Sequence, residues 1–142
     1  MKNIFKTTIV IILALFLGFI ALTSFNNPDE DIIGTWILEN DSNSKWVFTN
    51  DNCYWYYNDI LEDTLTYTIQ DLSDVQSSGG LSGGASVTLC GHNVKTGGTE
   101  DYYLKMTDQD NEQYCYEILG LSDENLSLNF LGQAKIKVFN KQ

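Results

Sequence analysis

Thr64–Gln70 (TLTYTIQ) is the stretch that decides the fold. Leu65, Tyr67 and Ile69 alternate with threonines over its whole length. A period of two places the large side chains on one face of a β-strand and the small polar ones on the other. The stretch therefore predicts a strand with one buried face and one face in water.

Similar strand signals lie on both sides of this stretch, with turn-forming Asn, Asp and Gly between them. They predict strands at Gly34–Glu39, Lys45–Thr49, Cys53–Tyr57, Ser86–Cys90, Tyr102–Thr107, Gln113–Leu119, Leu126–Leu131 and Ala134–Phe139. Two longer stretches predict loops: 71–85 is rich in Gly and Ser, and 91–101 contains three glycines. An open meander of this size would leave unpaired edges. We therefore expect an all-β fold, an antiparallel up-and-down barrel of about eight strands.

Residues 1–24 have the features of a signal peptide. Lys2 and Lys6 precede an apolar run, 7–22, that carries no charge, and cleavage is expected after Ser24. The run is shorter than the roughly 20 residues of a membrane-spanning helix. Leu22 is a poor residue for the cleavage motif, so an uncleaved anchor remains the alternative. We expect 25–142 to form one exported domain, periplasmic or secreted, with no stable membrane insertion after cleavage.

The charge of the chain disfavours binding to nucleic acid. The formal net charge is −11, and all eight basic residues are lysines. Nucleic-acid binders present basic patches, and arginine is the preferred residue for bidentate phosphate recognition. The composition is typical of an acidic, soluble exported protein.

Three cysteines, Cys53, Cys90 and Cys115, leave at least one thiol unpaired. Cys90 and Cys115 belong to predicted strands on either side of Tyr102–Thr107. Strands two apart in a sheet are separated by roughly 9–10 Å, beyond the ~7 Å Cα limit for a disulfide. We therefore expect three unpaired thiols, with one bridge as the alternative.

Three patterns together resemble the lipocalin-like domains of exported bacterial proteins. They are Gly34-Thr35-Trp36 on the first strand, Trp46-Val47-Phe48 before an Asn/Asp turn, and the late stretch Tyr116–Leu126. The resemblance implies that Trp36 is a structural plug across the closed end of a short barrel with a small cavity. In lipocalins an arginine near the last strand stacks over this tryptophan. This chain has no arginine, so Lys135 or Lys137 is the candidate cation.

Aromatic side chains are the candidates for lining a ligand cavity. Tyr54 and Tyr56 face one way on their strand, and Trp55 and Tyr57 face the other. One of these pairs should line the barrel interior, where aromatic rings give contact area and hydroxyls give orientation. The candidate ligand-lining residues are Tyr54, Trp55, Tyr56, Tyr57, Tyr67, Tyr102, Tyr114 and Tyr116. The alternative is that these rings simply pack.

No catalytic, metal or cofactor site is predicted. Cys90-Gly91-His92 is the one place where a thiol and an imidazole are close in sequence, and a structural role is favoured there. His92 is the sole histidine, and the cysteines lack zinc-ligand spacing. The acidic turn at 108–112 lacks the glycine and glutamate of a calcium loop.

Two hypotheses on function remain. The first is a non-enzymatic exported barrel that binds a small apolar or amphipathic ligand in its interior. The second is a structural or protein-interaction module of the cell envelope with a packed, ligand-free barrel. The sequence leaves the oligomeric state open.

Overall fold

The computed structural model of the chain describes residues 27–73, 86–95 and 101–142. The predicted signal segment, 1–24, lies outside the described residues, as do 74–85 of the first predicted loop and 96–100 of the second.

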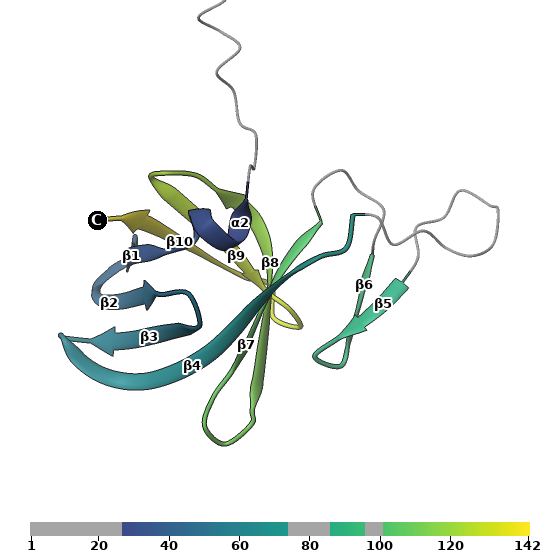
Figure 1. Cartoon of the computed structure of the whole chain (residues 1–142), viewed down its shortest axis with the longest axis horizontal. Helices are drawn as coiled ribbons and strands as arrows, with labels where there is room; N and C mark the ends of the chain where they lie inside the picture. Colours follow the sequence, from purple (N-terminus) through teal and green to yellow (C-terminus); the bar gives the residue numbers. More distant parts are fainter. Residues whose placement is uncertain (1–26, 74–85, 96–100) are drawn as a thin grey trace, which may run out of the picture.

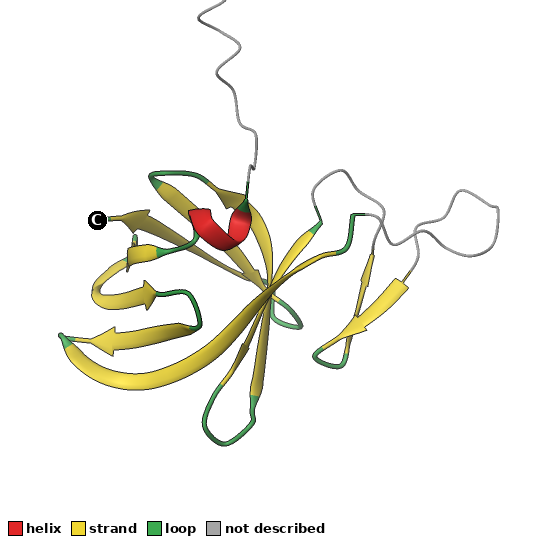
Figure 2. Cartoon of the chain, in the orientation of Figure 1, coloured by secondary structure: helices red, strands yellow, loops and turns green. Residues whose placement is uncertain are grey.

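Eight antiparallel strands form a closed barrel (Figures 1 and 2). Their order around the barrel is β1-β10-β9-β8-β7-β4-β3-β2, so that β1 pairs with both β2 and β10. The strands are β1 Gly34–Leu38, β2 Asp41–Phe48, β3 Asn52–Tyr57, β4 Ile60–Asp71, β7 Tyr102–Thr107, β8 Gln113–Leu121, β9 Asn125–Phe130 and β10 Lys135–Lys141. The prediction of an eight-stranded antiparallel up-and-down barrel is confirmed.

One predicted barrel strand does not belong to the barrel. β5, Ser86–Leu89, pairs only with β6, His92–Lys95, in a separate two-stranded hairpin beside the barrel (Figure 1). The hairpin turn is Cys90-Gly91, and both residues have positive φ angles, 48° and 77°, as tight hairpin turns require. β6 fell within a predicted loop because HNVK contains a single apolar residue and no alternation. Barrel strand β7 therefore pairs directly with β4.

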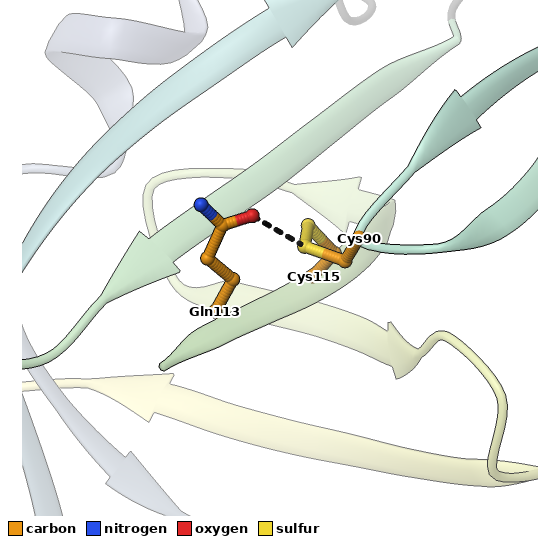
Figure 3. Close-up of a disulfide and its surroundings, with 3 residues drawn as sticks. All are labelled: Cys90, Gln113 and Cys115. Carbon is orange, nitrogen blue, oxygen red and sulfur yellow. Dashed lines mark hydrogen bonds between the residues drawn. A yellow bond between two sulfur atoms is a disulfide. The ribbon is translucent and has the colours of Figure 1, made fainter. Parts of the chain in front are cut away.

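The prediction of three unpaired thiols is wrong, because Cys90 and Cys115 form a disulfide (Figure 3). Their Cα atoms are 6.0 Å apart. The expected separation assumed that both residues lie in one sheet, whereas Cys90 is in the hairpin turn and Cys115 is on the outer face of β8. The amide oxygen of Gln113 lies 4.0 Å from the Cys90 sulfur. Among the described residues Cys53 is the free cysteine, and it is buried.

The hairpin packs on the outer face of β7 and β8 through a small apolar cluster. Its buried members are Leu72, Leu89, Val94, Tyr103 and Cys115. His92 lies against Gly132 in the β9–β10 turn, so closely that no Cβ would fit between them. The disulfide and this contact hold the hairpin at two points.

The barrel interior is filled with side chains over most of its length. Trp36, Phe48, Leu104, Leu126, Leu128 and Phe139 are completely or almost completely buried there. The three tryptophans form one row across the sheet: Trp36 pairs with Trp46, and Trp46 pairs with Trp55. Their exposed fractions are 0%, 6% and 38%. The row therefore runs from the deep core to the rim of the barrel.

A short helix lies at the barrel end where β1 begins and β10 ends. This helix, α2 (Pro28–Asp31), was not predicted, because four residues give no helical periodicity. The Trp36 Nε1–H donates to the Ile32 carbonyl oxygen just after the helix, at 2.7 Å. Lys141 Nζ lies 5.0 Å from the centre of the Trp36 ring and donates to the Asp31 carbonyl oxygen at 3.2 Å. The cation over Trp36 is thus Lys141 and not the expected Lys135 or Lys137.

Candidate functional site

A pocket opens at the barrel end opposite α2, where the β3–β4 and β7–β8 turns lie. Its volume is about 160 Å³. We call it the mouth pocket; it is lined by Trp46, Trp55, Asp63, Leu65, Met106, Tyr114, Tyr116 and Lys137. Most of its wall is aromatic or aliphatic, and it contains one carboxylate and one ammonium group.

The register of three neighbouring strands places part of this wall. Trp46, Trp55 and Asp63 pair directly across β2, β3 and β4, so their side chains share the inner face. Trp55 Nε1–H donates to the Ser44 hydroxyl at 3.3 Å, which fixes the indole at the rim. Tyr116 meets the Trp46 ring edge-on, with 5.9 Å between ring centres.

Three of the eight predicted ligand-lining residues lie in the mouth pocket: Trp55, Tyr114 and Tyr116. Tyr57 is on the same face of β3 as Trp55 but above the pocket, at the exposed rim. Tyr54 and Tyr56 lie on the opposite, outer face of β3.

The other two predicted residues lie deeper along the strands. Tyr67 packs edge-on against Phe48, with ring centres 5.1 Å apart, and donates to the Thr49 carbonyl oxygen at 2.6 Å. Burial raises its pKa to about 12. Tyr102 pairs with Asp71 at the far end of β4 and packs partly buried against the core.

Sequence reasoning missed five members of the wall: Trp46, Asp63, Leu65, Met106 and Lys137. The turn between β2 and β3, at 49–51, could have identified Trp46. A tight turn there sets the register of the hairpin and puts Trp46 opposite Trp55. No local signal identifies Met106 or Lys137, because the barrel closure brings β7 and β10 to this end.

Lys137 is the cation of the mouth pocket. Its Nζ lies 5.1 Å from the centre of the Trp46 ring. Burial, together with the nearby Lys135, lowers the pKa of Lys137. In the part of the chain that the structure describes, the one ion pair joins Lys45 to Asp59, so Lys137 has no carboxylate partner there. The buried Trp46 Nε1–H also has no hydrogen-bond partner within the described ranges.

Tyr114 connects the pocket to an acidic lip. Its hydroxyl lies 3.0 Å from Glu112 Oε2 and 3.2 Å from Asp108 Oδ2. The hydrogen bond to Glu112, followed by burial and Asp108, raises the Tyr114 pKa to about 12. Asp108 Oδ1 in turn accepts hydrogen bonds from the Asp110 and Glu112 backbone amides. The lip therefore holds the Tyr114 ring in place and keeps its hydroxyl protonated.

Two further groups near the pocket, the Cys53 thiol and the Tyr116 hydroxyl, have raised pKa values and are neutral in the folded protein. Burial, and secondly Asp63, raises the pKa of the Cys53 thiol. Burial also raises the pKa of Tyr116. A protonated, inaccessible thiol is not a nucleophile. The mouth pocket thus offers aromatic faces, hydroxyls and two opposite charges, which are groups suited to non-covalent binding.

No group of three or more His, Cys, Asp and Glu side chains within the described ranges is arranged to hold a metal ion. No helix among those residues has the length and apolar character needed to cross a membrane.

Comparison of the chain with protein-family models, curated proteins and solved structures gave no match.

Proposed function

We propose that the chain is a non-enzymatic, exported, lipocalin-like barrel that binds a small amphipathic molecule in the mouth pocket. The observation that carries this proposal is a pocket of about 160 Å³ at one end of an otherwise filled barrel. Trp46, Trp55, Tyr114 and Tyr116 give it aromatic walls, and Lys137 and Asp63 supply polar anchors. Ligand sites combine an apolar wall with a few convergent polar groups in this way.

The volume limits the size of the ligand. An apolar protein cavity of about 150 Å³ holds one benzene molecule, whereas pockets for drug-sized ligands measure about 300–1,000 Å³. The mouth pocket therefore takes one ring or a short chain. A longer alkyl tail would extend out of the barrel past Trp55, because Phe48, Phe139 and Leu104 fill the space below.

The lipocalin-like assignment rests on the opposite end of the barrel. Trp36 is fully buried on the first strand beside the short helix α2, with the Lys141 cation over its ring. This arrangement supports a lipocalin-like domain with a lysine in place of the arginine.

The binding proposal is tested with two-dimensional NMR of the purified protein. The three indole N–H signals report on separate places: Trp46 and Trp55 line the pocket, and Trp36 lies at the other end. We expect small one-ring amphiphiles such as 2-phenylethanol and phenylacetate to shift the Trp46 and Trp55 signals saturably and to leave Trp36 unchanged. W55A should weaken this binding without unfolding the barrel.

Absence of saturable binding by every probe would instead favour the interaction-module hypothesis. One observation speaks for that second function. Ile60 and Leu61 at the β3–β4 turn and Ile136 on β10 are large apolar residues with exposed fractions of 65%, 49% and 59%. Under this alternative, I60S/L61S would reduce association with an envelope partner and leave small-molecule binding absent.

A further inference from the structure

Lys137 lies between the barrel rim and the buried core in the row of inward-facing residues on β10. Lys135 is exposed at the barrel rim, Lys137 is partly buried one step inside, and Phe139 is completely buried below it. On β9, Lys137 pairs with the fully buried Leu128. The ammonium group is therefore held inside the mouth of the barrel, where the apolar wall limits its contact with water.

The ammonium group has only weak compensation for this burial. The Trp46 ring face, at 5.1 Å, provides a cation–π contact. Asp63 lines the same pocket, but its carboxylate and Lys137 form no ion pair, and Asp63 Oδ1 accepts the Thr64 backbone N–H at 2.7 Å. A partly buried charge without an ion-pair partner is costly, and the cost falls when an opposite charge binds beside it.

We propose that Lys137 is the anion-binding residue of the mouth pocket, and that the ligand is a small carboxylate with a body of about one aromatic ring. This inference rests on the proposed function. The ring packs among Trp55, Tyr114 and Tyr116, and the carboxylate approaches Lys137. A charge-assisted hydrogen bond between ammonium and carboxylate is stronger than a neutral one, and more so where water is excluded.

The same aromatic wall would suit a cationic ligand if Lys137 were absent. Aromatic rings together with a carboxylate, here Asp63, form the cages that bind organic ammonium groups. In this pocket Lys137 already lies over the Trp46 face, and its charge repels a second cation. Asp63 Oδ1 already accepts the Thr64 backbone N–H, so Lys137 is the charge that a ligand meets at the Trp46 face, and an anion complements it.

The test compares three probes of nearly the same size and different charge: phenylacetate, 2-phenylethanol and phenethylamine. Binding to the purified protein is followed at pH 7 by the Trp46 and Trp55 indole signals. We expect phenylacetate to bind about tenfold more tightly than 2-phenylethanol, as a charge-assisted hydrogen bond in a partly dry site would give. Phenethylamine should bind most weakly.

Two lysine variants test whether Lys137 causes the preference for phenylacetate over 2-phenylethanol. K137Q should remove the preference for phenylacetate while changing the affinity for 2-phenylethanol by less than about twofold. K105Q removes the same charge from the outer face of β7, where Lys105 lies away from the pocket. It should keep the preference. An unshifted Trp36 signal in each variant shows that the barrel is intact.

The outcomes separate the two proposals. If none of the probes binds, the proposed function fails and this inference fails with it. If phenylacetate and 2-phenylethanol bind equally to the native protein, or if K137Q keeps the preference, the pocket binds ligands but Lys137 does not select anions. Tightest binding of phenethylamine, lost in D63N, would show a cation site instead. The probe order on the native protein decides the matter even if a variant fails to fold.

Discussion

At the scale of single residues, two lysine–tryptophan contacts distinguish the two ends of the barrel. Lys141 lies over Trp36 and donates to the Asp31 carbonyl oxygen, so its charge is hydrogen-bonded. Lys137 lies over Trp46 without a hydrogen bond or ion pair in the described part of the chain. The same pair of residue types therefore forms a hydrogen-bonded contact at one end and lines the mouth pocket at the other.

Replacing Trp36 by phenylalanine should destabilise the protein by about 2 kcal/mol, because the buried Ile32 carbonyl oxygen loses its donor. W55F is the matched control: Trp55 is at the rim, and its hydrogen bond to Ser44 is long. It should cost less than about 0.5 kcal/mol. Urea denaturation followed by circular dichroism measures both. Equal losses in the two variants would show that Trp36 has no special role in the barrel.

K137M should stabilise the protein at pH 7, because the Lys137 ammonium group is partly buried and has no ion-pair partner among the described residues. The Lys137 pKa is below the ordinary lysine value of 10.5. At a pH between the lowered pKa of the folded state and 10.5, the unfolded chain holds the lysine proton and the folded chain does not. The free energy of unfolding therefore rises with pH across that window. Below the window the penalty is present in full. We expect K137M to be more stable than the native protein at pH 7 by on the order of 0.5 kcal/mol, after allowance for solvent screening.

The pH dependence provides the check. The advantage of K137M should shrink as the pH rises toward 10, because native Lys137 then loses its proton in the folded state. Tyrosines titrate in both proteins and cancel in the difference between them. K105M controls for the exchange of a lysine for methionine on the outer face. A K137M protein that is less stable at pH 7 would mean that the Trp46 cation–π contact outweighs the burial of the charge.

The sequence predicted the pocket residues only in part, because the identity of a single residue does not show which way its side chain faces. Aromatic content selects Trp55, Tyr114 and Tyr116, but it selects Tyr54 and Tyr56 equally. Alternation separates the two faces of β3 without saying which face is inward. Trp55 is identified as inward once the β2–β3 register places it opposite the buried Trp46.

At the scale of elements, the β5–β6 hairpin is an addition to the barrel and not a part of its closure. The sequence predicted β5 as a barrel strand because Ser86–Cys90 shows the same alternation as the barrel strands. Its alternating side chains instead face a second, smaller core on the outer surface of β7 and β8. A local sequence pattern does not distinguish packing against the barrel core from packing against this outer cluster, since both bury one face of a strand.

The disulfide should attach this hairpin to the barrel. The sequence separation of Cys90 and Cys115 is 25, and a closed loop of that length contributes about 3.5 kcal/mol in the chain-entropy model. We expect C90S/C115S to lose roughly this much stability in urea denaturation. Hydrogen exchange should accelerate first at His92–Lys95, before the amides of β8 and β9.

Two measurements control this prediction. The mass of the native protein, measured with and without reductant, should differ by two hydrogen masses. In the absence of reductant, one thiol, that of the buried Cys53, should react with a thiol reagent, and only in the unfolded protein. Added reductant should leave C90S/C115S unchanged. If the variant keeps native stability and slow exchange in β6, the apolar cluster alone holds the hairpin.

At the scale of the whole molecule, closure of the barrel was the most predictable feature. Short strands joined by Asn- and Asp-rich turns, with the single proline placed before β1, permit a continuous antiparallel ladder. The packing of side chains in the barrel interior could not be predicted from these strand and turn patterns. It depends on which inward residues of distant strands meet, as Phe139 of β10 meets Trp46 of β2 with ring centres 4.9 Å apart.

The net charge of the whole chain should make its stability increase with salt. At −11 the folded chain repels itself, and the described residues contain one ion pair, Lys45–Asp59, that salt would weaken. The Debye length falls from about 30 Å at 0.01 M to about 3 Å at 1 M, so long-range repulsion is screened before contacts at hydrogen-bond distance. We expect stability to rise by about 1 kcal/mol between 0.02 and 0.5 M NaCl, or roughly 4 °C in Tm. Differential scanning calorimetry measures the shift, and KCl should reproduce it because screening does not depend on the cation. A Tm that falls with salt would show that attractive contacts, such as those of Lys141 and Lys45, outweigh the repulsion.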